Sequence, residues 1–166
     1  MGIFTAAIAL MGRGGLRDTE ESPRARHSGD GTESRPTVLI IDDDTSFLEA
    51  MRTLLTEAGY NVLTSSTGPK GLDMVRYAPR DIAAVLLDFN MPRFNGAETL
   101  QFLRKLSPHV KVLAVSGISL SELPSEFREG VQRVVSKPFS NNDLLKTIDE
   151  VLHEQSETEL SAASAE

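Results

Sequence analysis

The feature of this sequence that most constrains its fold is an alternation of short apolar runs with longer segments whose apolar residues recur about every 3.6 positions. The apolar runs predict five strands, over residues 38–41, 60–64, 83–87, 110–115 and 131–135. The segments between them predict helices, and the one over 118–130 should be short because it contains Pro124. Strands that are apolar on both faces need cover on both faces, which favours a parallel sheet. We therefore predict an α/β fold, a three-layer doubly wound sheet of five parallel strands in the flavodoxin-like order 2-1-3-4-5.

Capping residues at the predicted helix ends agree with this alternation. Asp44 suits the N-cap of the first helix, and Ser46 and Glu49 also have the spacing of a capping box there. Gly59 is a natural residue to follow the end of that helix, and Ser140 suits the N-cap of the last one.

The composition divides the chain into three parts. Residues 1–36 lack the alternation and are mostly rich in Gly, Ser, Pro and mixed charges, so we expect a disordered N-terminal arm. Residues 37–154 carry the alternation and form the predicted domain. Residues 155–166 contain three Glu and no basic residue, which predicts a disordered acidic tail.

Composition also argues against several classes of protein. The 166 residues include no cysteine, which excludes disulfide frameworks and thiolate metal sites and fits a cytoplasmic protein. The net charge is −7 and no cluster of basic residues stands out, so we expect no direct nucleic-acid binding. No apolar run reaches the length of a transmembrane span.

Polar residues stand where the predicted strands end. Asp42 and Asp43 follow the first strand, Asp88 the third, Ser116 the fourth and Lys137 the fifth. Ligands of open parallel sheets bind at the carboxyl ends of the strands, so we expect these side chains to converge on one pocket.

The chemistry of this set suits phosphoryl transfer. Three crowded carboxylates repel one another and favour a cation, and an all-oxygen donor set is what Mg²⁺ prefers. A carboxylate can attack phosphorus, and the central position of the third strand makes Asp88 the best-placed nucleophile. Lys137 can supply a positive charge and Ser116 a hydrogen bond to the transferring group.

The segments VLIIDDDTSF, AVLLDFNMPRFNG, VLAVSG and VVSKPF resemble response-regulator receiver domains of two-component signalling, over about residues 37–153. The resemblance is to a chemotaxis-regulator-like receiver, standing alone or cut from a longer regulator. It implies that Asp88 is the phosphoacceptor, and that Ser116 and Lys137 assist. It also implies Mg²⁺ binding by Asp42, Asp43, Asp88 and the backbone carbonyl of Asn90, and a cis bond between Lys137 and Pro138.

The partners that this resemblance implies are a histidine kinase or phosphotransfer protein and an unidentified downstream protein. The chain would then be no conventional enzyme, with only self-phosphorylation and self-dephosphorylation chemistry. Two departures concern signal output: Val134 replaces the family's usual aromatic residue, and Pro124 lies in the segment of the fourth helix. Output would then rely on Ser116 and its loop, or the domain would be a relay that switches little.

Two alternatives remain open at this point. The spacing of Asp42, Asp44 and Ser46 nearly matches the first motif of haloacid-dehalogenase-type phosphohydrolases, with Asp42 as nucleophile, but it leaves Asp88 without a role. A degenerate, non-phosphorylated scaffold would account for Val134, but not for the acidic residues and lysine at the strand ends.

Overall fold

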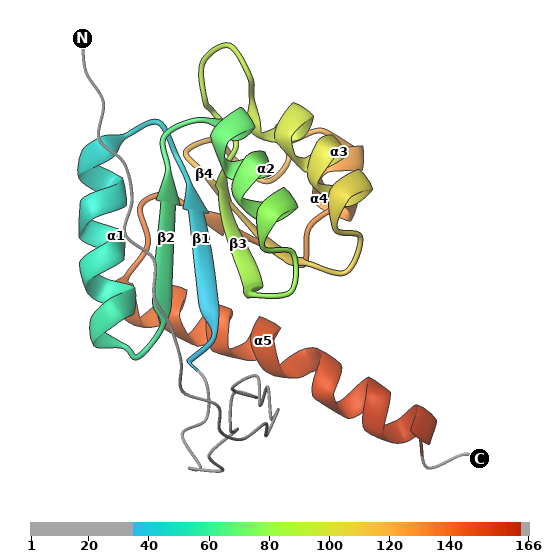
Figure 1. Ribbon diagram of the computed structural model, residues 1–166. Helices are drawn as coiled ribbons and strands as arrows, with labels where there is room; N and C mark the ends of the chain where they lie inside the picture. The colour runs from blue at the N-terminus through green and yellow to red at the C-terminus, as the bar shows by residue number, and fades with distance from the viewer. Residues whose placement is uncertain (1–34, 164–166) are drawn as a thin grey trace, which may run out of the picture. The chain divides into compact units, whose positions relative to one another are not determined.

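The computed structural model describes residues 35–163 (Figure 1). The strands are β1 (Thr37–Ile41), β2 (Asn61–Ser65), β3 (Ile82–Asp88), β4 (Lys111–Ser116) and β5 (Arg133–Ser136). The helices are α1 (Thr45–Glu57), α2 (Gly68–Tyr77), α3 (Gly96–Leu106), α4 (Ser125–Glu129) and α5 (Asn141–Ala163). The predicted arm over 1–36 lies, up to residue 34, outside the described residues.

The strands form one sheet in the order β2-β1-β3-β4-β5, and every neighbouring pair is parallel. The predicted fold class and strand order are therefore confirmed. The order reverses direction between β1 and β3, so the helices that follow these two strands leave from opposite faces of the sheet. The carboxyl ends of β1 and β3 meet at this switch point, where a doubly wound sheet opens a site.

The helices cover both faces of the sheet and create two apolar cores (Figure 1). On one face, α1 and α5 pack through residues such as Leu55 and Ile148. On the other face, α2, α3 and α4 pack through residues such as Val75, Leu103 and Phe127. Strand residues alternate between the two cores, and this two-sided burial explains why each strand reads as a continuous apolar run.

The ends of α1 show which capping residue is used. The Asp44 carboxylate accepts hydrogen bonds from the backbone N–H groups of Ser46 and Phe47, so Asp44 is the N-cap, as predicted. The capping box predicted at Ser46 and Glu49 is wrong, because Ser46 already lies inside the helix. Gly59 follows the helix end with φ of 96°, a conformation that glycine adopts without strain.

The two segments with unusual sequences also have defined structures. α4 has only five residues and begins directly after Pro124, in agreement with the prediction of a short helix. α5 does not end at the boundary predicted at residue 154 but continues through Ala163, since Gly and Pro are absent from this stretch and Ala, Leu and Glu favour helix. No helix among the described residues is long and apolar enough to cross a membrane.

Candidate functional site

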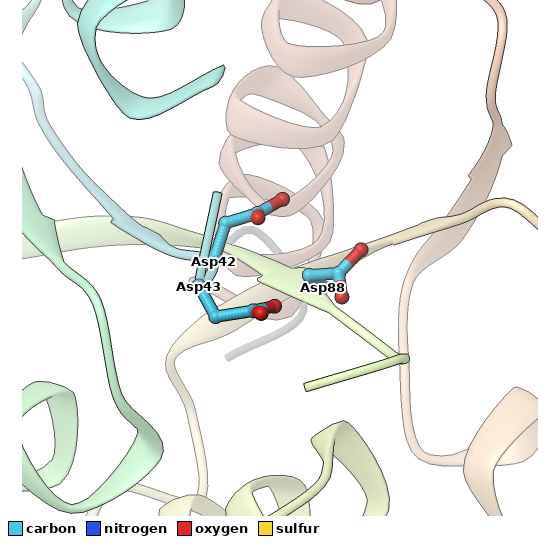
Figure 2. Close-up of side chains that lie close together, drawn as sticks. All are labelled: Asp42, Asp43 and Asp88. Atoms are coloured by element: carbon cyan, nitrogen blue, oxygen red, sulfur yellow. The ribbon is translucent and has the colours of Figure 1, made fainter. Parts of the chain in front are cut away.

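Three carboxylates gather at the carboxyl end of the sheet (Figure 2). One oxygen from each of Asp42, Asp43 and Asp88 lies within 4.8 Å of the others. Asp42 and Asp88 are only 2% and 5% exposed, whereas Asp43 is exposed. The site thus has a buried floor with one open side.

Strand pairing places these residues together. β1 and β3 are neighbours, and their register pairs Ile41 with Leu87. The next residue of each strand is therefore an aspartate, Asp42 on one side and Asp88 on the other. The convergence that the sequence predicted follows from this register, not from any local contact between the two segments.

Lys137 joins the two buried carboxylates. Its Nζ donates hydrogen bonds to Oδ2 of Asp42 at 2.8 Å and to Oδ1 of Asp88 at 3.0 Å. Burial by itself lowers the pKa of Lys137, but the two hydrogen bonds and the two negative charges outweigh it, so this pKa lies above its ordinary value. The ammonium group therefore stays charged at neutral pH.

The backbone around Asp88 fixes the position of its carboxylate. The N–H of Asn90 donates to Oδ2 of Asp88 at 2.8 Å, while Lys137 holds Oδ1. A Cβ atom added to Gly96 would lie 2.5 Å from the carbonyl oxygen of Asp88, so only glycine permits this close approach of α3 to the β3 end.

The charge environment raises the pKa of Asp88. Burial is the largest cause, and it acts against the hydrogen bond from Lys137, which lowers the pKa. The negative charge of Asp42 adds to the rise, and the balance leaves the pKa of Asp88 above its ordinary value. One ammonium group thus compensates only part of the negative charge gathered here.

Both oxygens of Asp42 accept hydrogen bonds within the protein. Its Oδ1 accepts the N–H of Asp44 at 2.8 Å, and its Oδ2 accepts from Lys137. Asp44, the second residue of the phosphohydrolase-like motif, is committed to capping α1. This capping role of Asp44 disfavours the phosphohydrolase alternative, which pairs Asp42 as nucleophile with Asp44 as its second motif residue.

Ser116 and Asn90 lie at the same edge of the sheet. Ser116 is fully buried, and its Oγ accepts the N–H of Ile118 at 3.1 Å, so the hydroxyl is engaged within its own loop. Its backbone carbonyl accepts the N–H of Lys137 at 2.7 Å, which ties the ends of β4 and β5 together. The peptide bond between Lys137 and Pro138 is cis, as the resemblance implied.

A groove of about 410 Å³ opens beside Asp43. Its walls come from the start of α2 with the loop before it and from the loop between β3 and α3, and they include Pro69, Met91 and Phe94. Arg93 also lines the groove and has φ of 69°, an uncommon conformation for a residue other than glycine. The open side of the acidic cluster is therefore accessible to a molecule outside the protein.

Sequence reasoning missed one contact at the site. The ring of Phe47, in the first turn of α1, lies below Lys137 with its centroid 4.2 Å from Nζ. Phe47 belongs to the apolar residues that recur about every 3.6 positions over 47–58, a pattern that indicates a core position and no more. No short-range sequence signal connects positions 47 and 137, so this contact could be found only from the fold.

The residues present fit a hard divalent cation. The three clustered donors are all carboxylates, and Asp43 makes the cluster accessible from outside. Mg²⁺ prefers such oxygen donors and retains part of its water shell, which suits a cluster that is buried on one side and open on the other.

Comparison with known proteins places the chain in one family. The family model for the response regulator receiver domain matches residues 38–149. The cell cycle transcriptional regulator CtrA of Caulobacter vibrioides is 28% identical over 116 residues, which make up 69% of this chain and 49% of that protein. The chain therefore spans about half the length of the curated relatives it matches.

Solved structures agree with this assignment. A CheY-like response regulator receiver domain protein from Methanospirillum hungatei JF-1 is 33% identical with a TM-score of 0.68, covering 75% of this chain and 99% of that one. The chemotaxis protein CheY4 of Vibrio cholerae is 27% identical with a TM-score of 0.64, covering 71% of this chain and 99% of that one.

Proposed function

This chain belongs to the response regulator receiver domain family, and on that premise we propose that it takes a phosphoryl group onto Asp88 within a two-component phosphorelay. The observation that carries the proposal is the geometry around Asp88. Its carboxylate is buried beside two further carboxylates and within hydrogen-bond distance of Lys137. A mere turn or surface aspartate would have neither the burial nor these neighbours.

The transfer step is a displacement at phosphorus. A carboxylate oxygen of Asp88 forms a bond to phosphorus, and the bond between phosphorus and the donor breaks. With a phosphohistidine donor, the imidazole nitrogen leaves with the bonding electron pair. The ammonium group of Lys137 already hydrogen-bonds to Asp88, so it can donate to the phosphoryl oxygens as negative charge develops on them.

Ser116 would assist by donating a hydrogen bond from its hydroxyl to a phosphoryl oxygen. The hydroxyl now donates to the carbonyl oxygen of Ile118 at 3.4 Å, so it must leave this partner before it can donate to a phosphoryl oxygen. Protein groups that are held in place before the transfer stabilise the developing charge without further reorganisation. Lys137 is already held beside Asp88 before the transfer, whereas the hydroxyl of Ser116 must first leave Ile118.

Magnesium would be held by Asp42, Asp43, Asp88 and the backbone carbonyl of Asn90. When bound, the ion neutralises negative charge on the carboxylates and on the transferring phosphoryl oxygens. The N–H of Asn90 donates to the Asp88 carboxylate, so the backbone of Asn90 lies beside the acidic cluster.

The partners follow from the chemistry of the site. The donor would be a histidine kinase or a phosphotransfer protein, and the phosphorylated domain would signal through contacts with a downstream protein. The excess of acidic residues favours protein partners over direct contacts with nucleic acid for this domain. We place this signalling in the cytoplasm. Its chemistry on itself, uptake and loss of the phosphoryl group, is the only reaction we assign to it.

The test is incubation of the full chain with Mg²⁺ and acetyl phosphate, followed by intact-mass measurement. We expect the mass of one phosphoryl group to be added, and hydroxylamine to remove it, because acyl phosphates are cleaved by this nucleophile. Asp88→Asn should remain unmodified. Clear Mg²⁺ binding without an adduct under any donor would contradict the proposal and favour the scaffold alternative.

A further inference from the structure

The ammonium group of Lys137 has a neighbour that does not hydrogen-bond to it. Two of its three N–H groups can be assigned to Asp42 and Asp88. On another side lies the ring of Phe47, with its centroid 4.2 Å from Nζ. This distance is within the range of a cation–π contact, in which the negative face of a ring attracts a cation.

The position of Phe47 is itself fixed by the acidic site. The backbone N–H of Phe47 donates to the Asp44 carboxylate, and the N–H of Asp44 donates to Asp42. Asp42 in turn accepts from Lys137, whose Nζ lies over the Phe47 ring. These contacts form a closed circuit of four residues that joins the first turn of α1 to the loop after β5.

A second ring supports Phe47 from outside the circuit. Phe139, two residues after Lys137, meets Phe47 edge-on with the ring centroids 6.1 Å apart. Both rings are half-buried and pack against the core on the face covered by α1 and α5. The contact with Phe139 and the packing against the core therefore limit the freedom of the Phe47 ring to turn away from Lys137.

The nature of this contact matters for phosphoryl transfer. A hydrogen-bonding residue in place of Phe47 would engage a third N–H of Lys137 and hold it in one direction. A ring face attracts the charge without claiming a particular N–H, so the ammonium group can redirect a hydrogen bond from Asp88 to an arriving phosphoryl oxygen. The ring also occupies space that water would otherwise fill, which strengthens the remaining electrostatic interactions of Lys137.

We propose that Phe47 is a positioning residue for phosphoryl transfer, whose ring holds the Lys137 ammonium at Asp42 and Asp88 while leaving its hydrogen bonds free to shift. This inference rests on the proposed function of Asp88 as phosphoacceptor. In this role Phe47 acts through its contact with Lys137 and not on the phosphoryl group itself.

The competing explanation is that Phe47 merely fills space in the core. Pentafluorophenylalanine in place of Phe47 distinguishes the packing role from the cation–π role. It approximately preserves the shape of the ring but reverses the charge distribution of its face. Phe47→Tyr retains the attractive ring face, and Phe47→Leu removes the ring. Phe102→Leu is a matched control, because it removes an exposed ring that lies 5.3 Å from Lys105 on α3.

The experiment measures the rate constant of adduct formation at fixed Mg²⁺ and acetyl phosphate, together with the thermal midpoint of each variant. We expect pentafluorophenylalanine and Phe47→Leu to slow the reaction by about threefold to thirtyfold, the range that cation–π contacts of this kind span. Phe47→Tyr and Phe102→Leu should keep the parent rate.

Each other outcome decides against the proposal. A parent rate with pentafluorophenylalanine, combined with a slow Phe47→Leu, would assign Phe47 a packing role only. Parent rates in all variants would show that the contact does not affect transfer. An unmodified parent protein would overturn the proposed function itself, and that result is distinguishable because it appears before any variant is compared.

Discussion

The Nζ atom of Lys137 lies 3.0 Å from Oδ1 of Asp88 although the two residues are 49 positions apart in the sequence. The same nitrogen lies 2.8 Å from Oδ2 of Asp42, so one ammonium group serves two buried carboxylates. The sharing leaves negative charge at the carboxyl end of the sheet uncompensated. This imbalance has consequences for stability, for metal binding and for the chemistry of Asp88.

The metal-free protein should become more stable when Asp88 is made neutral. Burial and the charge of Asp42 raise the pKa of Asp88 above the ordinary 3.8, so the folded state holds the proton more tightly than the unfolded state. The resulting stabilisation is fully present below the ordinary pKa and is lost as pH rises through the folded-state pKa. At neutral pH in EDTA, Asp88→Asn should therefore have a higher thermal midpoint than the parent.

The dependence on pH provides the control for this prediction. The difference in midpoint between Asp88→Asn and the parent should shrink as the pH is lowered, because the parent carboxyl becomes protonated. Asp73→Asn, which alters an exposed carboxylate on α2, should show no comparable change. A lower midpoint for Asp88→Asn at neutral pH would mean that the hydrogen bond from Lys137 outweighs burial.

Magnesium should raise the thermal midpoint of the parent, and Asp43→Asn should weaken that effect. A ligand that binds only the folded state stabilises it by RT ln(1 + c/Kd), where c is the free ligand concentration, so the midpoint rises as c increases relative to the dissociation constant Kd. Asp43 is the informative position because it is exposed, whereas Asp42 and Asp88 are buried and form ion pairs with Lys137. Its replacement removes a candidate ligand with little disturbance of the fold.

Thermal unfolding in EDTA and in increasing Mg²⁺ measures this effect. The two proteins should have similar midpoints in EDTA and diverge as Mg²⁺ is added. An equal Mg²⁺ response in both would contradict the assignment of Asp43 as a ligand.

Gly96→Ala should destabilise the domain, because the added Cβ atom meets backbone and not a flexible side chain. The nearest atoms are the carbonyl oxygen of Asp88 at 2.5 Å and the Cα of Phe89 at 2.7 Å. We expect a loss of about 1–3 kcal/mol in the free energy of unfolding, as for other overpacked sites. Gly117→Ala is the matched control, since no heavy atom lies within 4 Å of its added Cβ. Equal stability of both variants in urea denaturation would contradict the close approach of α3.

Particular residues show how far the sequence predicts this molecule. The strand order and the gathering of Asp42, Asp88 and Lys137 could be predicted, because apolar runs on both sheet faces dictate a parallel sheet and each run ends in a polar residue. The capping residue of α1 was ambiguous between Asp44 and Ser46, and the choice depends on where the helix begins after β1.

Other features depend on the folded chain. The contact between Phe47 and Lys137 joins positions that only the fold brings together, and the engagement of Ser116 by its own loop depends on the local backbone. α5 continues through Ala163 although residues 155–163 are acidic, because Ala, Leu and Glu favour helix and composition alone does not show where a helix ends. Long-range contacts and marginal helix ends are thus the parts that sequence patterns leave open.

Signal output should begin at Ser116 in place of the missing aromatic residue. Val134 is partly buried against the core, whereas the hydroxyl of Ser116 must leave the carbonyl oxygen of Ile118 to donate to a phosphoryl oxygen. We therefore expect beryllofluoride with Mg²⁺, a mimic of the phosphoryl group, to increase amide hydrogen exchange at Ile118 and in the loop before α4. Ser116→Ala should abolish this increase. Unchanged exchange over residues 116–136 in the parent would instead favour a relay that switches little.

The most direct test of the central claim is chemical mapping of the phosphorylated residue. The full chain is treated with Mg²⁺ and acetyl phosphate and reduced with borohydride, which converts an aspartyl phosphate into homoserine, and its peptides are then analysed by mass spectrometry. The account predicts homoserine at position 88 and aspartate unchanged at positions 42 and 43. Homoserine at position 42, or at several aspartates without preference, would contradict it.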